Sequence, residues 1–213
     1  NDISEPTSAA IYFTNASGSE FSDNDLITTG YGLYASNASG SIASGNTIFT
    51  GYSGATIDMP NCDNCEIDGN SITGLTGPSG SGISSSNSDN AIISNNEMDV
   101  SSYGISSQNS TGVIIEYNNV IFSNDNWGIN FDGSENATIK YNRLIGVGES
   151  NGIYNGASNQ NAVVSNNYLE IYGNGDWRES YYGIIAHDST IEEDTLFITN
   201  SGHDQDTGGI LAD

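Results

Sequence analysis

A repeat of 22 to 31 residues runs through the chain and restricts the folds that it can adopt. Each copy opens with a small residue that is followed directly by an apolar one. Apolar residues also stand at offsets eleven and sixteen, and an asparagine stands at offset fourteen; after Gly128 these are Ile139, Leu144 and Asn142. Copies open at Ala10, Gly32, Thr56, Gly82, Gly104, Gly128, Gly152, Gly183 and Gly209. A period of this size predicts a solenoid in which each copy forms one coil.

The residues within each copy predict strands. Apolar runs, such as those at 113–115 and 162–164, are too short for helices and are bounded by Gly, Asn, Ser and Asp. Parallel strands of successive coils would stack about 4.8 Å apart. We therefore expect residues 10–213 to form one all-β domain, a single-stranded parallel β-helix of about eight to nine coils. Residues 1–9 are expected to form an extended polar N-terminal segment.

Two columns of asparagine mark expected turns. The column at offset fourteen, with one extra residue in the copy at Gly152, contains Asn24, Asn46, Asn70, Asn96, Asn118, Asn142 and Asn167. Stacked amides can hydrogen-bond along a solenoid axis, and these short side chains tolerate left-handed backbone. We expect this column to form an asparagine ladder on a left-handed turn. A second column, at offset five, contains Asn15, Asn37, Asn61, Asn87 and Asn109 and predicts another turn.

The repeated Gly-Ile and Asn-x-(Leu/Ile/Met/Val) signatures resemble those of the right-handed parallel β-helix superfamily. That superfamily includes pectate lyases, polygalacturonases, phage tailspikes and many surface proteins. The resemblance covers residues 10–213 and implies a right-handed coil, which also follows from the usual handedness of parallel crossovers. The resemblance is specific for the fold. It does not specify a function, because this scaffold carries unrelated activities.

The charge of the chain excludes several classes of partner. Three basic residues, Lys140, Arg143 and Arg178, stand against 27 acidic ones, for a formal net charge of −24. Nucleic acids and anionic membranes need basic residues for binding, so neither is expected as a partner. No apolar run approaches the roughly 18 residues of a membrane span, so we expect no membrane insertion.

The acidic composition favours cationic partners or bound cations. We expect no cofactor, and Ca²⁺ is the ion that Asp63, Asp68 and Asp125 could hold between turns. The chain contains no Asp-x-Asp-x-Asp-Gly calcium loop. The metal prediction therefore rests on carboxylate number alone.

Cys62 and Cys65 are the only cysteines of the chain. A C-x-x-C pair can form a redox centre, half of a zinc site or a short disulfide. No second cysteine pair is present, and His187 and His203 lie several coils away, so a zinc site within one chain is disfavoured. We favour a small disulfide that closes a surface turn; a metal shared between chains is the alternative.

Several features favour an extracellular or cell-surface location. The sequence begins at Asn1 without Met, as a mature or excised product would. Lysine is rare, and Asn15, Asn37, Asn109 and Asn136 each begin an N-glycosylation acceptor triplet. Chance also produces such triplets in a chain rich in Asn and Ser.

One group of outward residues could support chemistry on sugars. Asp132 and His187 fall in one outward column, two coils and therefore roughly 10 Å apart. The longest coil adds Trp177 and Arg178, and Trp127 and Tyr154 lie nearby. Aromatic rings could stack on sugars while a carboxylate and an imidazole transfer protons.

The resemblance to polysaccharide lyases implies a catalytic base with Ca²⁺ ligands, and the resemblance to polygalacturonases implies clustered aspartates on adjacent coils. The coil between Asp132 and His187 offers Gly156 and no carboxylate in that column. We therefore assign no catalytic residue, and the favoured interpretation of Asp132, His187 and Arg178 is that of ordinary surface polar groups.

The favoured function is structural, as a building block of an extracellular fibre, sheath or surface layer. Neither end shows an evident cap over its strand edges, so we expect end-to-end self-association. The first alternative is a carbohydrate-active enzyme, either a polysaccharide lyase or a glycoside hydrolase, with its site at Asp132, His187 and Arg178. The second is a non-catalytic glycan-binding module that uses Trp127, Tyr154 and Trp177.

Overall fold

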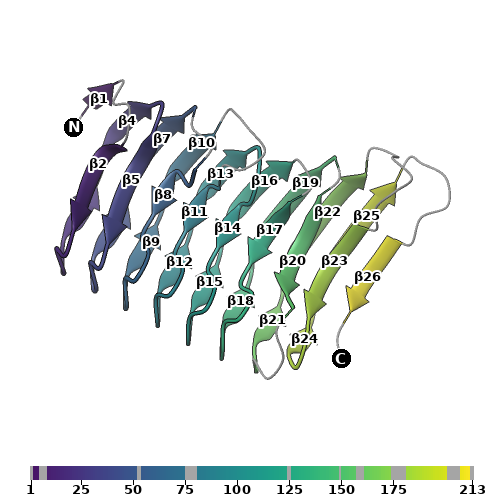
Figure 1. The fold of residues 1–213 in the computed structure, drawn as a ribbon. Helices are drawn as coiled ribbons and strands as arrows, with labels where there is room; N and C mark the ends of the chain where they lie inside the picture. The colour runs from purple at the N-terminus through teal and green to yellow at the C-terminus, as the bar shows by residue number, and fades with distance from the viewer. Residues whose placement is uncertain are drawn as a thin grey trace.

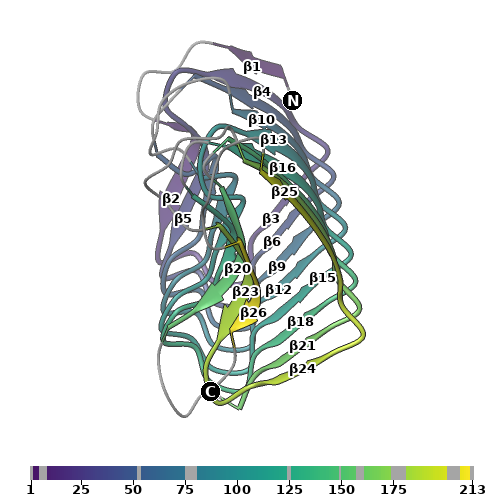
Figure 2. The same cartoon turned by 90° about the vertical axis from the view of Figure 1, so that its right-hand side faces the viewer.

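The computed structural model confirms the all-β solenoid. It describes residues 2–4, 9–51, 54–74, 81–123, 126–148, 150–156, 161–173, 181–200 and 207–211. The strands of these residues form three parallel sheets of nine, nine and eight strands, which Figures 1 and 2 show as three sides of one coil. Each coil contributes one strand to each of the three sheets, which we call B, C and A in the order in which the chain meets them, and the next coil then begins.

The strand bounds follow this order. Sheet A contains β1 (Asp2–Ser4), β4 (Asp25–Thr28), β7 (Thr47–Thr50), β10 (Ser71–Gly74), β13 (Glu97–Val100), β16 (Asn119–Ser123), β19 (Arg143–Val147), β22 (Tyr168–Gly173) and β25 (Thr195–Asn200). Sheet B contains β2 (Ala9–Thr14), β5 (Tyr31–Ser36), β8 (Ile57–Asp58), β11 (Ile83–Ser84), β14 (Ile105–Ser106), β17 (Trp127–Asn130), β20 (Asn151–Asn155), β23 (Tyr181–Ala186) and β26 (Thr207–Leu211). Sheet C contains β3 (Glu20–Ser22), β6 (Ile42–Ser44), β9 (Glu66–Asp68), β12 (Ile92–Ser94), β15 (Ile114–Glu116), β18 (Thr138–Lys140), β21 (Val163–Ser165) and β24 (Thr190–Glu192).

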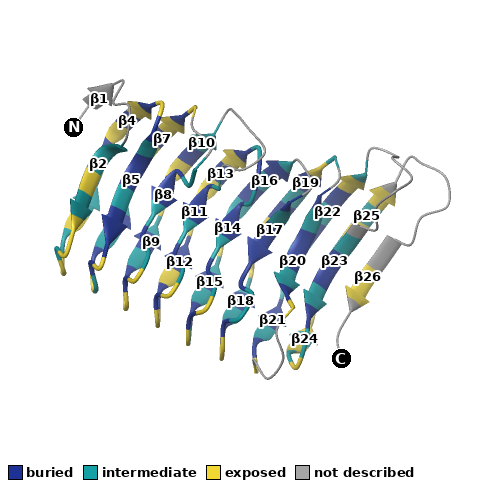
Figure 3. Cartoon of the chain, viewed as in Figure 1, coloured by how far each residue is buried: buried dark blue, intermediate teal, exposed yellow. Residues whose placement is uncertain are grey.

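The register of the sheets places the predicted apolar columns in the interior. In sheet B, Ile83 pairs with Ile57 on one side and with Ile105 on the other. These side chains and the apolar residues at offsets eleven and sixteen are fully buried in the central coils, as Figure 3 shows by colour. At the last strand, Ile210 is 50% exposed because no further described coil covers it. Within the segment at 1–9, residues Asp2–Ser4 form β1, which pairs with β4.

The offset-fourteen asparagines form the predicted ladder. Asn118 is typical, because its Nδ2 donates to Asn142 Oδ1 at 3.0 Å and to the Ile93 carbonyl of the preceding coil at 2.9 Å. Its own Oδ1 accepts from the backbone N–H and the side-chain Nδ2 of Asn96, both at 3.0 Å. The ladder asparagines from Asn46 to Asn167 are each 1% exposed. The amides therefore fill an interior strip in which side chains of successive coils satisfy one another.

The expectation of left-handed backbone at the ladder asparagines is wrong. Positive φ occurs one residue earlier, at Asp23, Gly45, Gly69, Asn95, Tyr117, Tyr141, Asn166 and Glu193. The preceding residue makes the turn, so that the asparagine side chain can point inward between coils. The offset-five column is confirmed as a turn, because Asn15, Asn37, Asn61, Asn87 and Asn109 have φ between 51° and 56°.

An aspartate occupies the C-terminal position of the ladder. Asp194 Oδ1 accepts from the backbone N–H and the Nδ2 of Asn167, at 2.7 and 2.9 Å. Asp194 Oδ2 is buried without a hydrogen-bond partner. In the asparagines of the ladder, an amide Nδ2 takes the place of this carboxylate oxygen and donates to carbonyl oxygens. Burial raises the pKa of Asp194 above its usual range, and the two hydrogen bonds from Asn167 lower it by less.

We expect Asp194→Asn to stabilise the fold at neutral pH by about 1 kcal/mol, because an amide can donate where the carboxylate cannot. A carboxyl with a raised folded pKa loses stability as the pH rises from its unfolded pKa to its folded pKa. The advantage of the variant should therefore be full above the raised pKa, shrink as the pH falls from the raised pKa to the ordinary aspartate value, and stay at its minimum below that. Urea unfolding of both proteins across this range measures the difference, and a constant difference would contradict the assignment.

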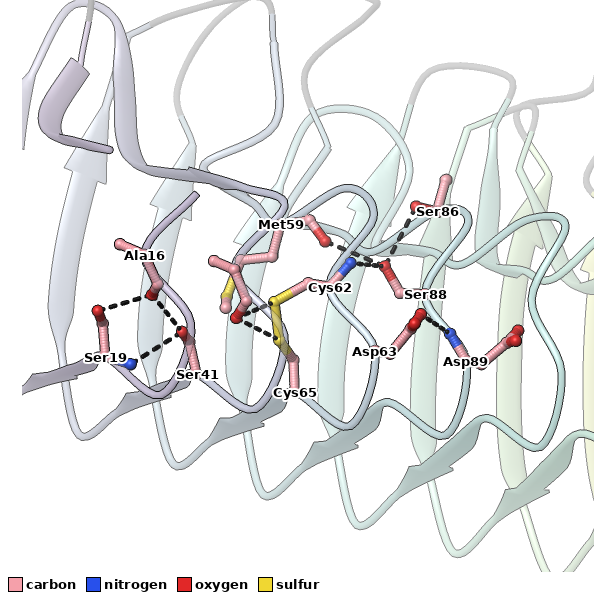
Figure 4. The surroundings of a disulfide bond; sticks show 11 residues. Ala16, Ser19, Ser41, Met59, Cys62, Asp63, Cys65, Ser86, Ser88 and Asp89 are labelled. Carbon is pink, nitrogen blue, oxygen red and sulfur yellow. Dashed lines mark hydrogen bonds between the residues drawn. A yellow bond between two sulfur atoms is a disulfide. The ribbon is translucent and has the colours of Figure 1, made fainter. Parts of the chain in front are cut away.

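The Cys62–Cys65 pair forms a disulfide between two short serine ladders (Figure 4). In the earlier coils, the backbone N–H of Ser19 donates to Ser41 Oγ at 3.0 Å, at offset nine. In the later coils, Ser88 Oγ accepts from the Cys62 N–H at 2.9 Å, at offset six. The backbone N–H groups of Ser88 and Ser110 donate in the same way to the serine hydroxyl of the next coil. The two cysteines occupy both offsets in the coil where one ladder ends and the other begins.

The disulfide lies in the interior and not at the surface where the sequence analysis placed it. The exposed fractions of Cys62 and Cys65 are 0% and 1%. Their Sγ atoms lie 3.0 and 3.5 Å from the Ala38 carbonyl oxygen. Ser41 Oγ donates to the Ala16 carbonyl at 3.2 Å in the preceding coil, so Cys65 replaces a serine in an equivalent contact.

This equivalence predicts the outcome of two double substitutions. Removing the disulfide should cost about 2 kcal/mol in either case. Cys62→Ser with Cys65→Ser should then be more stable than Cys62→Ala with Cys65→Ala by about 1 kcal/mol, because a hydroxyl at position 65 can donate to the Ala38 carbonyl. Thermal or urea unfolding of the two variants compares them directly. Equal stabilities would show that the serine ladder does not extend through this coil.

Candidate functional site

The outer face of sheet B brings two of the predicted aromatic residues together. Trp127 on β17 and Tyr154 on β20 have ring centroids 4.6 Å apart at an interplanar angle of 32°. Both side chains are half-buried, because they lie on the outer face of neighbouring strands and cover one another. The pair forms a small aromatic platform on the outer face of the sheet.

Asp132 lies next to this platform, just after β17. Its Oδ1 accepts from the Gly156 backbone N–H at 3.0 Å, and its own N–H donates to Asn130 Oδ1 at 3.1 Å. A Cβ atom at Gly156 would collide with the Tyr154 hydroxyl, so the tyrosine side chain extends along its strand over Gly156. The structure therefore places Trp127, Tyr154 and Asp132 in one group.

The other predicted residues are less well connected to this group. His187 follows β23, and its backbone N–H donates to the Asn155 carbonyl at 3.3 Å. This contact places it one coil beyond Tyr154 and two coils beyond Asp132, or roughly 10 Å from Asp132 by strand spacing. Trp177 and Arg178 lie outside the described residues. The triad of Asp132, His187 and Arg178 stays a prediction.

A second aromatic cluster on sheet B was not predicted from the sequence. The rings of Tyr12 and Tyr34 are stacked 5.1 Å apart at 8°, and Tyr31 lies 5.5 Å from Tyr34. In the next coil, burial raises the pKa of Asp58, and a hydrogen bond with Ser84 lowers it by less. A signal for the stacked pair was present in the sequence, because Tyr12 and Tyr34 share one offset in consecutive coils.

Two of the aspartates proposed for metal binding accept hydrogen bonds from the next coil. Asp63 Oδ1 accepts from the Asp89 N–H at 2.9 Å, and Asp68 Oδ1 accepts from Ser94 Oγ and Asn95 Nδ2, both at 2.7 Å. Asp125 lies outside the described residues. Among the residues that the structure does describe, no group of three or more His, Cys, Asp or Glu side chains could hold a metal ion.

The four N-glycosylation acceptor asparagines occupy similar places. Asn15, Asn37, Asn109 and Asn136 are all exposed and have φ between 51° and 56°. They lie on exposed turns, from which an attached glycan would extend into solvent. Glycosylation itself stays a prediction. None of the described segments forms a helix suited to crossing a membrane.

Several solved structures are similar to this chain at low sequence identity. A family 28 exopolygalacturonase from Yersinia enterocolitica aligns with a TM-score of 0.36 and 10% identity, over 87% of this chain and 48% of the enzyme. The surface adhesin PfbA of Streptococcus pneumoniae aligns with a TM-score of 0.39 and 12% identity, over 96% of this chain and 75% of the adhesin. The enzymatically active domain of bacteriophage CBA120 tailspike protein 2 aligns with a TM-score of 0.32 and 13% identity, over 93% and 42%.

The chain thus spans about half the length of the exopolygalacturonase that it resembles. No curated protein matches its sequence. The family model described as "Periplasmic copper-binding protein (NosD)" matches residues 1–176. Because this match covers most of the repeat and the three parallel sheets agree with it, the chain belongs to the NosD family of right-handed β-helix proteins.

Proposed function

We propose that this protein is an extracytoplasmic β-solenoid that serves as a rigid scaffold and binds glycans on the outer face of sheet B. The observation that carries the proposal is the contact of Trp127 with Tyr154 beside the carboxylate of Asp132. Aromatic rings supply apolar surface for the C–H groups of a sugar, and a carboxylate accepts hydrogen bonds from its hydroxyls. The parallel strands hold these groups on a rigid surface, which reduces the entropy lost on binding.

The arrangement supports binding better than cleavage. Asp132 Oδ1 already accepts a hydrogen bond from Gly156, which holds the carboxylate in place. His187 lies two strand spacings away, roughly 10 Å from Asp132. The enzyme alternative therefore depends on groups besides Asp132 and His187, and its candidate Arg178 lies outside the described residues.

Copper does not fit the residues that the structure describes. Copper sites in proteins use imidazole, thiolate and thioether ligands, and Cu(II) also takes mixed nitrogen and oxygen ligands. No three His, Cys, Asp or Glu side chains of the described residues come together to form such a set. Both cysteines are in the disulfide, and Met59 and Met98 are buried in the core at different coils. His187 is the one histidine within the described ranges, and His203 lies outside them. We therefore assign no copper-dependent step to this chain.

The location outside the cytoplasm rests on two observations. The family is described as periplasmic, and the cysteine pair of this chain is in a disulfide, which persists in oxidising compartments. End-to-end assembly into fibres stays a second prediction, which light scattering and electron microscopy of the purified protein would test.

The decisive experiment is a glycan-array screen followed by titration calorimetry of the best ligand. We expect Trp127→Ala to weaken binding by about tenfold or more, since stacking on one aromatic ring contributes about 1–3 kcal/mol. Tyr103→Ala is the matched control, because Tyr103 occupies the column of Trp127 one coil earlier. Equal binding by the two variants and the parent would refute this site.

Turnover of the bound glycan is measured in the same samples. Cleavage that Asp132→Asn abolishes while binding persists would favour the enzyme alternative. Binding without new reducing ends or unsaturated products would favour the scaffold.

A further inference from the structure

The corner between sheets C and A carries an unusual pair of exposed aromatic residues. Tyr117 and Tyr141 have stacked rings, with centroids 5.1 Å apart at 10°, and side chains that are 53% and 46% exposed. Both have positive φ, at 58° and 56°. The same corner of the other coils carries mainly Gly, Asn and Asp, which tolerate this backbone better. The two tyrosines thus occupy strained positions without being buried.

A polar hollow lies beside this corner, on the outer face of sheet A. It has a volume of about 200 Å³, and its outward-facing lining residues are Ser71, Thr73, Glu97, Asp99, Asn119 and Ile121. These side chains come from three neighbouring strands, β10, β13 and β16, in register. Tyr117 stands two residues before Asn119, on the turn that leads into β16, and is not itself part of the lining. The turn with the tyrosine pair thus leads directly into a strand that contributes to the hydroxyl- and carboxylate-rich floor.

The charges of the hollow define the ligand that it can take. Glu97 and Asp99 are exposed acceptors on one strand, and the lining contains no basic residue. Arg143 Nη1 donates at 3.2 Å to Oδ1 of Asn119, which lines the hollow, so this guanidinium lies at the rim. Its Nη2 pairs with Glu170 at 3.6 Å, which offsets part of its charge. A ligand must therefore bring hydrogen-bond donors, and a positive charge is attracted while a carboxylate is repelled.

We propose that this hollow and the Tyr117–Tyr141 pair form a second glycan site, which binds saccharides with free amino groups. The ammonium groups would pair with Glu97 and Asp99, hydroxyls would contact Ser71 and Thr73, and a sugar ring would lie against Tyr117. Lys140 pairs with Glu116 at 3.1 Å, and its Nζ lies 6.0 Å from the Tyr141 ring centroid, so the ammonium groups of the ligand would use the two carboxylates and not this ring. This site lies on a different sheet from the group at Trp127, so either site can fail without the other.

The test uses titration calorimetry of the full chain with three probes of equal length: a glucosamine oligomer, its N-acetylated form and a galacturonate oligomer. We expect the glucosamine oligomer to bind most tightly, the N-acetylated form about tenfold more weakly, and the galacturonate oligomer not at all. Added salt should weaken the binding of the glucosamine oligomer, because the contact is between opposite charges.

Two double variants assign the binding to residues. Tyr117→Asn with Tyr141→Asn should weaken glucosamine-oligomer binding by about tenfold or more. It should fold at least as stably as the parent, since neighbouring coils carry Asn95 and Asn166 at this corner. Glu97→Gln with Asp99→Asn should remove the preference for the amino form over the acetylated form. Trp127→Ala should leave this binding unchanged.

The proposal is overturned if the tyrosine variant binds as tightly as the parent. It is equally overturned if no probe binds, if the acetylated form binds as tightly as the amino form, or if Trp127→Ala alone removes binding of the glucosamine oligomer. The last result would assign the ligand to sheet B.

Discussion

Asn118→Ala is expected to lower the free energy of unfolding by about 4 kcal/mol, the largest effect that we predict for one side chain. The substitution removes the acceptor of the Asn96 backbone and side-chain N–H groups. It also removes the donor to the carbonyls of Ile93 and Glu116 and to Asn142 Oδ1. Each buried group left unsatisfied costs about 1–3 kcal/mol, and several are created at once. Urea unfolding monitored by circular dichroism measures the loss.

Two controls separate the ladder from other effects at this corner. Asn119→Ala, one residue later, removes a half-exposed side chain that contacts Arg143, and it should change stability by less than about 0.5 kcal/mol. Asn118→Asp keeps the acceptor and the shape but loses the donors, so it should fall between the parent and Asn118→Ala. A loss below about 1 kcal/mol for Asn118→Ala would mean that the coils stack without help from the ladder.

Gly104→Ala should cost about 3 kcal/mol or prevent folding, although it adds one methyl group. A Cβ at this position would collide with the side chain of Val120 and lie 2.5 Å from the Gly128 carbonyl oxygen of the next coil. The carbonyl belongs to the backbone of a parallel sheet and cannot move without breaking inter-coil hydrogen bonds. Overpacking of a rigid interior therefore has no cheap relaxation here.

The matched control for this prediction lies in the same column. A Cβ added to Gly209 would meet no heavy atom within 4 Å. Gly209→Ala should therefore leave the thermal unfolding temperature nearly unchanged while Gly104→Ala lowers it by several degrees. Similar shifts for both variants would refute inter-coil crowding as the reason for glycine at this offset.

The repeat made the architecture predictable from the sequence. In a solenoid each coil contacts mainly its neighbours, so a fixed offset in the sequence becomes a column in space. Ile57, Ile83 and Ile105 could be placed on top of one another in the interior for this reason. The asparagine ladder followed from the same logic, while the left-handed residue was misplaced by one position because a column alone does not reveal dihedral angles.

The candidate site was predicted only in part. Trp127, Tyr154 and Asp132 lie on neighbouring coils, and the contact of Trp127 with Tyr154 and that of Asp132 with Gly156 follow from outward-facing columns. The partners of Asp194 and the interior position of Cys62 and Cys65 were not predicted. Both depend on which way a side chain leaves a turn, and that direction is set by backbone angles that differ from residue to residue.

The sequence by itself determined the fold class, the interior columns and the acidic surface. Period, apolar spacing and charge can be read from each copy of the repeat, and stacking the copies as coils does not change them. Only the tertiary structure decided which outward residues meet. Tyr117 and Tyr141 stack at a corner, Glu97 and Asp99 line a hollow with Asn119, and the disulfide joins two serine ladders. These groupings depend on the turn angles and on the inter-coil register, which bring side chains from different coils within contact distance.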